Sequence, residues 1–247
     1  MGGIFVSREM TVAVPIGGLK LGIGADGNVP GNLILHVQFD VCPTWTELSL
    51  RHLEEAKTNR AAREAAWAGT DEAQKAATLE REFEASIQAI MAAAIAIDAF
   101  YALIKTHVQL PPSLVERWRT NRTPRYSQVT EVLRRAFHLK PKGAAALRQN
   151  LKEIYRLRDL AVHPSGDIKA PILHPEINVG VEWRFVYFRA QNAELAVNAA
   201  TWILWGLAHG GKPKDGKVVE YMAGLHQRLA ELFPTGHPSA AIAVPPP

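Results

Sequence analysis

Apolar side chains recur at three- and four-residue steps along most of the chain after residue 43, which is the pattern of amphipathic helices. Residues 89–104 are apolar almost all round, so they predict a central, buried helix. Residues 193–208, with Trp202 and Trp205, are similarly apolar and predict its packing partner. In total, helices are predicted at 44–67, 71–107 (or from 79), 114–120, 127–138, 148–163, 193–208 and 218–233.

Local signals place two helix starts. Thr44, with Glu47 three residues later, predicts a capping box at the start of the first helix. The Gly69-Thr70-Asp71 sequence predicts a break, after which Thr70 or Asp71 caps the second helix.

Asp98 interrupts the apolar pattern of the central helix. A buried carboxylate needs a polar partner, so we predict a basic or hydroxyl group on the 148–163 helix. The alternative is that Asp98 lies at the edge of the buried face and contacts water.

Residues 1–42 differ from the rest, because short β-prone runs there are broken by Gly and Pro. We predict strands at 4–6, 11–14, 19–23 and 33–41, forming a small sheet or hairpin arm that packs on the helical part. A second β-like pair is predicted at 177–181 and 183–188, inside an irregular stretch in which His174-Pro175 forms a turn.

Two glycine-rich sequences imitate phosphate-binding loops. The GxGxxG sequence at 22–27 is followed by a turn and no helix, which excludes a dinucleotide site. The sequence at 206–212 follows a helix and continues with Pro213 where a phosphate loop needs Ser or Thr, so we exclude that site as well.

The sequence therefore predicts a mainly α protein with four parts. These are a β-rich N-terminal arm (1–43), a charged helical segment (44–81), a helical core (82–210) with a short β-like insertion before its last helix, and a C-terminal helix with a flexible Pro-rich tail (211–247).

The candidate chemistry lies at 148–167, RQNLKEIYRLRDLAVHPSGD. Pro164 disfavours helical backbone at the preceding residue, so the helix is predicted to end at or near His163. Asp159, four residues earlier on the same face, is within reach to orient the imidazole. Arg158 is five residues earlier and well around the helix. It meets His163 only if the last turn is distorted, if its long side chain reaches across, or if a second copy of the chain completes the site.

The Arg-polar-x-x-x-His pattern of Arg158, Asp159 and His163, within the flanking sequence LRDLAVHP, resembles the signature of HEPN domains. Residues 86–104, SIQAIMAAAIAIDAFYALI, resemble the first core helix of that family, and the resemblance covers about 82–209. It implies a HEPN-like helical bundle that commonly pairs as a homodimer. It also implies a role as a toxin or defence effector, with a cognate antitoxin protein as a partner.

The activity that the resemblance implies is a metal-independent endoribonuclease that leaves 2′,3′-cyclic phosphates. His163 would be the general acid–base, Arg158 would stabilise charge on the phosphate oxygens, and Asp159 would orient His163 or bond the backbone. The alternative is a non-catalytic HEPN-like module that binds a nucleotide, RNA or a partner protein. Burial distinguishes the two. If His163 and Arg158 point into a dry core, the module is favoured, and if they share a solvent-reached cleft with basic neighbours, the nuclease is favoured.

Charge is unevenly distributed. Residues 105–160 hold 13 Lys and Arg against 4 Asp and Glu, a net charge of +9, whereas the rest of the chain carries −5. This fits RNA as a partner, although a solvated basic surface without a partner gives the same pattern. The candidate RNA-binding residues are Arg119, Arg122, Arg125, Arg148, Lys152 and Arg156. Trp118 and Tyr126 stand among them and could stack on bases, but we favour packing into the core for both.

Composition also bears on disulfides, metal binding and cellular location. Cys42 is the one cysteine, so no disulfide framework is expected, and the N-terminus lacks a signal-peptide pattern. The stretch 89–104 is too short to span a membrane. The nine His show no HxxxH or HExxH spacing, so we expect no metal and no cofactor. We expect a cytoplasmic protein that does not bind membranes.

Overall fold

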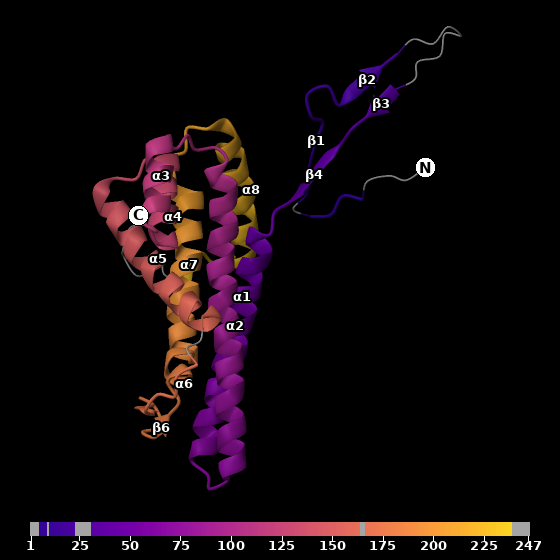
Figure 1. Cartoon of the computed structure of the whole chain (residues 1–247). Coiled ribbons are helices and arrows are strands. Elements are labelled where there is room, and N and C mark those ends of the chain that lie inside the picture. Colours follow the sequence, from indigo (N-terminus) through magenta and orange to yellow (C-terminus); the bar gives the residue numbers. More distant parts are fainter. Residues whose placement is uncertain (1–4, 9, 23–30, 164–165, 239–247) are drawn as a thin grey trace. The chain divides into compact units, whose positions relative to one another are not determined.

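The computed structural model describes residues 5–8, 10–22, 31–163 and 166–238 (Figure 1). The chain divides into two compact units, Met1–Val41 and Cys42–Pro247. It is mainly helical with a few short strands, as predicted.

The N-terminal unit is built from two antiparallel strand pairs. β1 (Met10–Ala13) pairs with β4 (His36–Phe39), and β2 (Leu19–Leu21) pairs with β3 (Gly31–Leu33). Because β2 and β3 lie between β1 and β4 in the chain, the four strands form one interrupted hairpin. The strand predicted at 11–14 is found one residue earlier, and those predicted at 19–23 and 33–41 are found in shorter form. Phe5 and Val6 are not in a strand, and most of the GxGxxG sequence lies outside the described residues.

The helical unit begins with a long antiparallel hairpin of α1 (Cys42–Trp67) and α2 (Glu72–Lys105) (Figure 1). Asp71 caps α2 as predicted, accepting hydrogen bonds from the N–H groups of Ala73 at 2.9 Å and Gln74 at 3.1 Å. The predicted cap of α1 is wrong. The helix starts at Cys42, so Thr44 lies inside its first turn and is not the N-cap residue.

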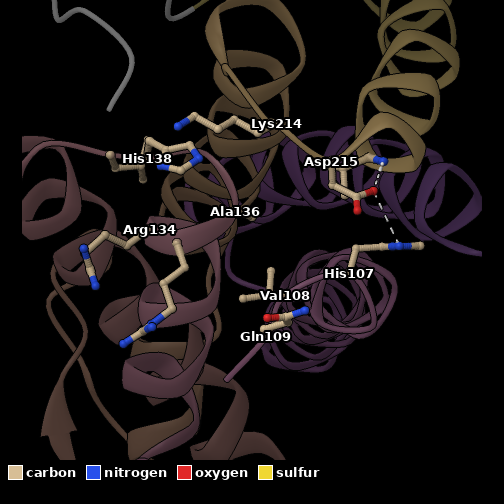
Figure 2. Close-up of a pocket in the computed structure, with 11 residues that line it drawn as sticks. His107, Val108, Gln109, Arg134, Ala136, His138, Lys214 and Asp215 are labelled. Carbon is tan, nitrogen blue, oxygen red and sulfur yellow. Dashed lines mark hydrogen bonds and ion pairs between the residues drawn. The ribbon is translucent and has the colours of Figure 1, made fainter. Parts of the chain in front are cut away.

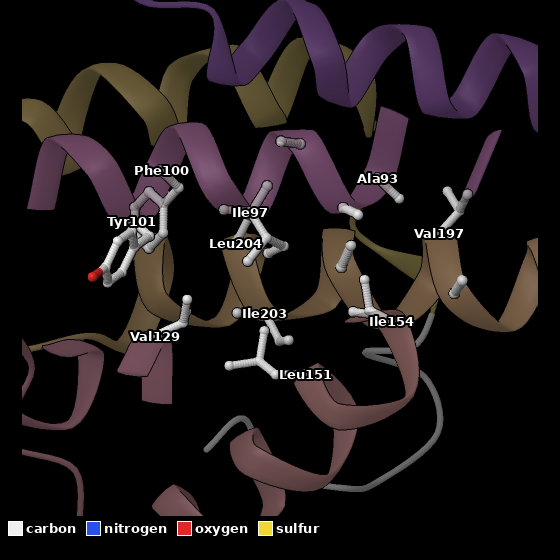
Figure 3. Close-up of a cluster of buried hydrophobic side chains, with 14 of the residues drawn as sticks. Ala93, Ile97, Phe100, Tyr101, Val129, Leu151, Ile154, Val197, Ile203 and Leu204 are labelled. Carbon is white, nitrogen blue, oxygen red and sulfur yellow. The ribbon is translucent and has the colours of Figure 1, made fainter. Parts of the chain in front are cut away.

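The core forms where α2 meets α7 (Ala190–Gly210) and α5 (Pro141–Val162), with α4 (Arg125–Ala136) beside them. Figure 3 shows Ile97 of α2 against Leu204 of α7, with Leu151 of α5 beneath them. The predicted pairing of the two most apolar helices is thus confirmed. By length and composition α2 could also cross a membrane, but more than half of its most apolar window is buried inside the unit, as in a core helix of a soluble protein.

The remaining elements are α3 (Pro112–Thr120), β5 (Ile172–Leu173), β6 (Gly180–Val181), α6 (Trp183–Tyr187) and α8 (Gly216–Leu232). One strand prediction is wrong, because residues 183–187 form the short helix α6. Glu182 caps it by accepting from the N–H of Arg184 at 2.8 Å, and Trp183 is buried in the core. Capping and packing outweigh the β propensity of these aromatic and β-branched residues. β6 pairs instead with β5, and residues 175–177 form a turn.

A buried ion network attaches this insertion to the hairpin of α1 and α2. The side chain of Arg63 in α1 is fully buried and bonds both Glu82 of α2 and Glu176 of the insertion. Arg189 also contacts Glu176, at 3.2 Å, and Glu82 accepts from the backbone N–H of Ala190 at 3.0 Å. Burial alone would raise the pKa of Glu176, but the hydrogen bond and charge of Arg63 hold that pKa below its ordinary value.

The start of the C-terminal segment is packed, although the sequence predicted a flexible tail from residue 234. His237 is 2% exposed, and its ring nitrogen lies 2.8 Å from the hydroxyl of Thr201 in α7. Its ring lies against those of Trp202, Trp205 and Phe233. Residues 239–247 lie outside the described residues.

Candidate functional site

The motif lies at the C-terminal end of α5, as predicted. Pro141 opens the helix, where its missing N–H costs nothing, and Leu147, Leu151 and Ile154 fix its buried face. The last helical residue is Val162, and His163 follows as the C-cap with φ −122° and ψ 64°. The N–H of His163 donates to the carbonyl of Asp159 at 3.0 Å. This hydrogen bond fixes the backbone of His163 to the last turn of the helix.

The three motif side chains reach solvent. The side chain of Arg158 is 34% exposed, that of Asp159 is 58% exposed, and His163 is exposed. Asp159 pairs with Arg158, whose Nη1 donates to Oδ1 at 3.0 Å. Among the described residues no hydrogen bond joins the Asp159 carboxylate to the imidazole, so the expected orientation of His163 by Asp159 is absent in this arrangement.

Arg158 and His163 are not hydrogen-bonded to each other among the described residues. At about 100° per residue, five residues of an ideal helix place two side chains roughly 140° apart around the axis. His163, as the C-cap residue, has backbone angles that are no longer helical. A site that uses both groups on one phosphate therefore needs a second copy of the chain or a rearrangement.

A basic stripe leads along α5 to His163. Arg148, Lys152 and Arg156 are exposed and four residues apart, so they follow one side of the helix. Arg156 lies seven residues before His163, which is almost two full turns, so the stripe and the imidazole share a face. Arg156 pairs with Glu153 at 2.9 Å. Both side chains are close to half exposed, so the pair holds Arg156 only weakly.

The candidate RNA-binding residues before α5 are arranged differently. Arg125 is bound to Asp98 of α2 at 2.8 Å, and its guanidinium lies over the ring of Tyr101, so it joins α4 to α2. Arg119 is largely exposed with a weak contact to Glu116 at 3.3 Å, and Arg122 is exposed in the loop that follows. Trp118 and Tyr126 are partly buried against the core, as we favoured from the sequence.

Sequence reasoning did not find one further group of residues. A cavity is lined by His107, Arg134, Arg135, His138 and Lys214 (Figure 2). They come from three segments of the chain, and no linear pattern joins them. In the described part of the chain, no group of three His, Cys, Asp or Glu side chains is arranged to hold a metal ion.

Comparison with known proteins identifies no family for this chain, because no family model, no curated protein and no solved structure matches it.

Proposed function

We propose that this protein is a metal-independent endoribonuclease of HEPN type. The observation that carries the proposal is the solvent exposure of Arg158, Asp159 and His163 at the end of α5, beside a basic stripe. The motif does not lie in a dry core, which was the arrangement expected of a non-catalytic module; the shared cleft expected of a nuclease would form only in the dimer.

The chemistry needs few groups. The 2′-hydroxyl of the RNA attacks the adjacent phosphorus, the 5′-oxygen of the next nucleotide leaves, and a 2′,3′-cyclic phosphate remains. His163 serves as the general acid–base, since histidine exchanges protons near neutral pH. Arg158 stabilises the charge that develops on the non-bridging oxygens. Arg148, Lys152 and Arg156 hold the RNA backbone along α5.

A homodimer is part of the proposal. Because Arg158 and His163 of one chain face apart, the composite site takes Arg158 from one copy and His163 from the other. Symmetric pairing of two identical surfaces is the commonest form of association and makes two such composite pairs. The release of Arg158 from Asp159 costs little, because both side chains are partly exposed.

The first experiment is cleavage of a labelled RNA pool in EDTA by the full chain and by His163→Ala and Arg158→Ala. We expect cyclic phosphate ends from the wild type and a loss of about a hundredfold or more in each variant. The controls are His36→Ala and Arg51→Ala, both at exposed positions outside α5 and its motif, which should cleave as the wild type does.

Mixing the two inactive variants tests the composite site. After subunit exchange, about half of the dimers pair one variant with the other, and each of these holds one complete Arg158–His163 pair out of two. We therefore expect recovery of about a quarter of the wild-type rate. No recovery by the mixture, with an active wild type, would mean that the site forms within one chain or needs both pairs.

The biological role that we propose with this activity is that of a toxin or defence effector. Expression of the wild type in bacterial cells should stop growth and cleave cellular RNA, whereas the same level of His163→Ala should do neither. Equal growth in both cultures would argue against this role without touching the chemistry measured in vitro.

The second candidate is a non-catalytic module that binds a nucleotide, RNA or a partner protein. The ion pair of Arg158 with Asp159 favours it, because both groups then serve only the helix end. RNA that binds the folded wild type and His163→Ala equally, and is cleaved by neither, would identify this function.

A further inference from the structure

A cavity of about 540 Å³ lies where the C-terminal ends of α2 and α4 meet the start of α8. Figure 2 shows the polar side chains that these three elements contribute to its lining. His107 follows α2, Arg134 and His138 come from the end of α4, and Lys214 and Asp215 precede α8. The volume is within the range of small-molecule sites, which is roughly 300–1,000 Å³.

Positive charge exceeds negative charge around this cavity. Arg134 bonds Glu131 through Nε at 2.7 Å and Nη2 at 2.9 Å, and Arg135 bonds the same carboxylate at 2.7 Å. Two guanidinium groups thus share one carboxylate. Lys214 is exposed, and among the described residues it has no ion-pair partner.

Asp215 lines the cavity and offsets part of this charge, while its hydrogen bonds go to the helix. Its Oδ1 accepts from the N–H groups of Lys217 at 3.0 Å and Val218 at 3.2 Å, which caps α8. The same oxygen lies 3.7 Å from Nδ1 of His107, close enough to attract the ring but long for a hydrogen bond. The cavity therefore presents Arg134, Arg135 and Lys214 to an anion.

A backbone hydrogen bond fixes the part of the cavity wall that follows α4. Leu139 donates its N–H to the carbonyl of Arg134 at 3.0 Å, and His138 between them has φ 52°. Glycine is the usual residue at this position after a helix, and a histidine there costs on the order of 1 kcal/mol. The imidazole is thus placed at the cavity at some expense in stability.

Gly211 allows the loop before α8, which contains Lys214, to pack closely against the end of α4. A Cβ at this position would lie 2.7 Å from Cδ1 of Phe137 and 2.3 Å from the carbonyl oxygen of Leu207. Because only a glycine fits against the Phe137 ring, the loop between α7 and α8 approaches the end of α4 closely. Lys214 is thereby held on the same cavity as Arg134.

The lining is not only charged. Val108, Leu139 and the buried Val218 provide apolar surface, and Gln109 adds an amide that can donate and accept hydrogen bonds. A ligand that fits carries an anionic group at one end and a less polar body with hydrogen-bonding groups. Guanidinium forks and an ammonium suit a phosphate in particular, since it offers several oxygens and more than one negative charge.

The cavity is remote from the motif. Leu139 lies just before α5 and His163 just after it, so the 22 residues of α5 separate the two sites by about 33 Å. The inference therefore stands independently of the proposed nuclease activity.

We propose that this cavity binds a small phosphate-bearing molecule, with Arg134, Arg135, Lys214 and His138 around the phosphate. The test is calorimetric titration of the full chain with pyrophosphate and with adenosine monophosphate, at low and at moderate salt. Binding of both probes indicates recognition of the phosphate alone. Tighter binding of the nucleotide indicates that the apolar surface takes part.

Lys214→Ala should weaken binding roughly tenfold or more, the usual effect of losing a hydrogen bond to a charged group. The matched control is Lys217→Ala, an exposed lysine three residues along that does not line the cavity. Equal weakening by both variants would mean general attraction to a basic surface and would overturn the proposal. Wild-type protein that binds neither probe at millimolar concentration would also overturn it.

His138→Gly separates ligand binding from folding. Glycine suits the φ of 52° better than histidine does, so this variant should unfold at the same temperature as the wild type or higher. It should nevertheless bind the phosphate probes more weakly. Unchanged affinity in a folded His138→Gly variant would remove the imidazole from the site and contradict the proposed arrangement.

Discussion

The hydroxyl of Tyr155 on α5 donates a hydrogen bond of 2.8 Å to Oδ1 of Asp98 on α2. Arg125 of α4 bonds the same oxygen through Nε, also at 2.8 Å. One carboxylate thus joins the motif helix, α5, to α2 and α4. Burial and, after it, the charge of Asp98 raise the pKa of Tyr155 far above its ordinary value, so the hydroxyl keeps its proton and remains a donor.

Replacing Tyr155 by phenylalanine should destabilise the protein by about 1–2 kcal/mol, because the ring packing is kept and one hydrogen bond to a charged group is lost. Thermal unfolding should show a midpoint lower by roughly 2–8 °C for a unit of this size. Tyr126→Phe is the control, since the Tyr126 hydroxyl has no hydrogen bond among the described residues. Equal midpoints for the two variants would mean that the Asp98 contact contributes nothing.

The Arg63 network should be far more sensitive than the surface ion pairs. Arg63→Met leaves Glu82, which is 1% exposed, as a buried charge without its cation, so we expect a loss of about 3–5 kcal/mol. Arg60→Met is the control. Arg60 contacts the same Glu176, but its side chain is 38% exposed, and the loss should stay below about 1 kcal/mol. Urea unfolding measures both.

Adding Glu82→Gln to Arg63→Met should recover part of the loss, because the uncompensated charge is then removed. A double variant that is less stable than Arg63→Met alone would contradict the charge argument and point to packing as the cause.

Stability should fall as the pH is lowered below about 6.5. Burial lowers the pKa of His237 to about 4, so between pH 6.5 and pH 4 the unfolded chain binds a proton that the folded chain does not. This group contributes stability above pH 6.5 that is lost progressively towards pH 4, on the order of 2–3 kcal/mol. Burial and the nearby Arg63 also lower the pKa of His174, which adds a loss of the same sign.

The variant His237→Gln checks this prediction when its free energy of unfolding is measured as a function of pH. Its stability at pH 7 is expected to be lower, since ring contacts with Trp202 and Phe233 are lost, but its dependence on pH between 6.5 and 4 should be flatter. Parallel curves for the variant and the wild type would assign the acid sensitivity to other groups.

Two glycine-to-alanine substitutions should act in opposite directions. Gly211→Ala places a Cβ against Phe137 and the Leu207 carbonyl and should destabilise by about 1–3 kcal/mol. Gly224 lies exposed inside α8 with nothing within 4 Å of an added Cβ, so Gly224→Ala should stabilise by about 0.5–1 kcal/mol. Differential scanning calorimetry of the two variants and the wild type measures both changes in unfolding temperature. A stabilised Gly211→Ala would show that the loop before α8 is not held by Phe137.

The sequence by itself determined those features that depend on neighbours along the chain. The apolar periodicity identified α2 and α7 as core partners, Asp71 marked the start of α2, and Pro164 marked the end of α5. A basic or hydroxyl partner on the 148–163 helix was predicted for Asp98, because a carboxylate inside an apolar helix needs one; the structure supplies the hydroxyl of Tyr155 there, and a basic partner, Arg125, on α4. Local backbone preferences and helical periodicity are properties of short segments, so they are readable without the fold.

Only the tertiary structure decided what distant segments do together. Residues 183–187 look like a strand in isolation, but Glu182 caps them and the core takes up Trp183, so they form α6. Arg63, Glu82 and Glu176 meet only after folding, and so do the side chains around the cavity beside α8. The environment of Arg158 and His163 also became visible only in the structure, where both side chains reach solvent at the end of α5. Burial and charge pairing between remote residues arise from packing, and no local pattern encodes them.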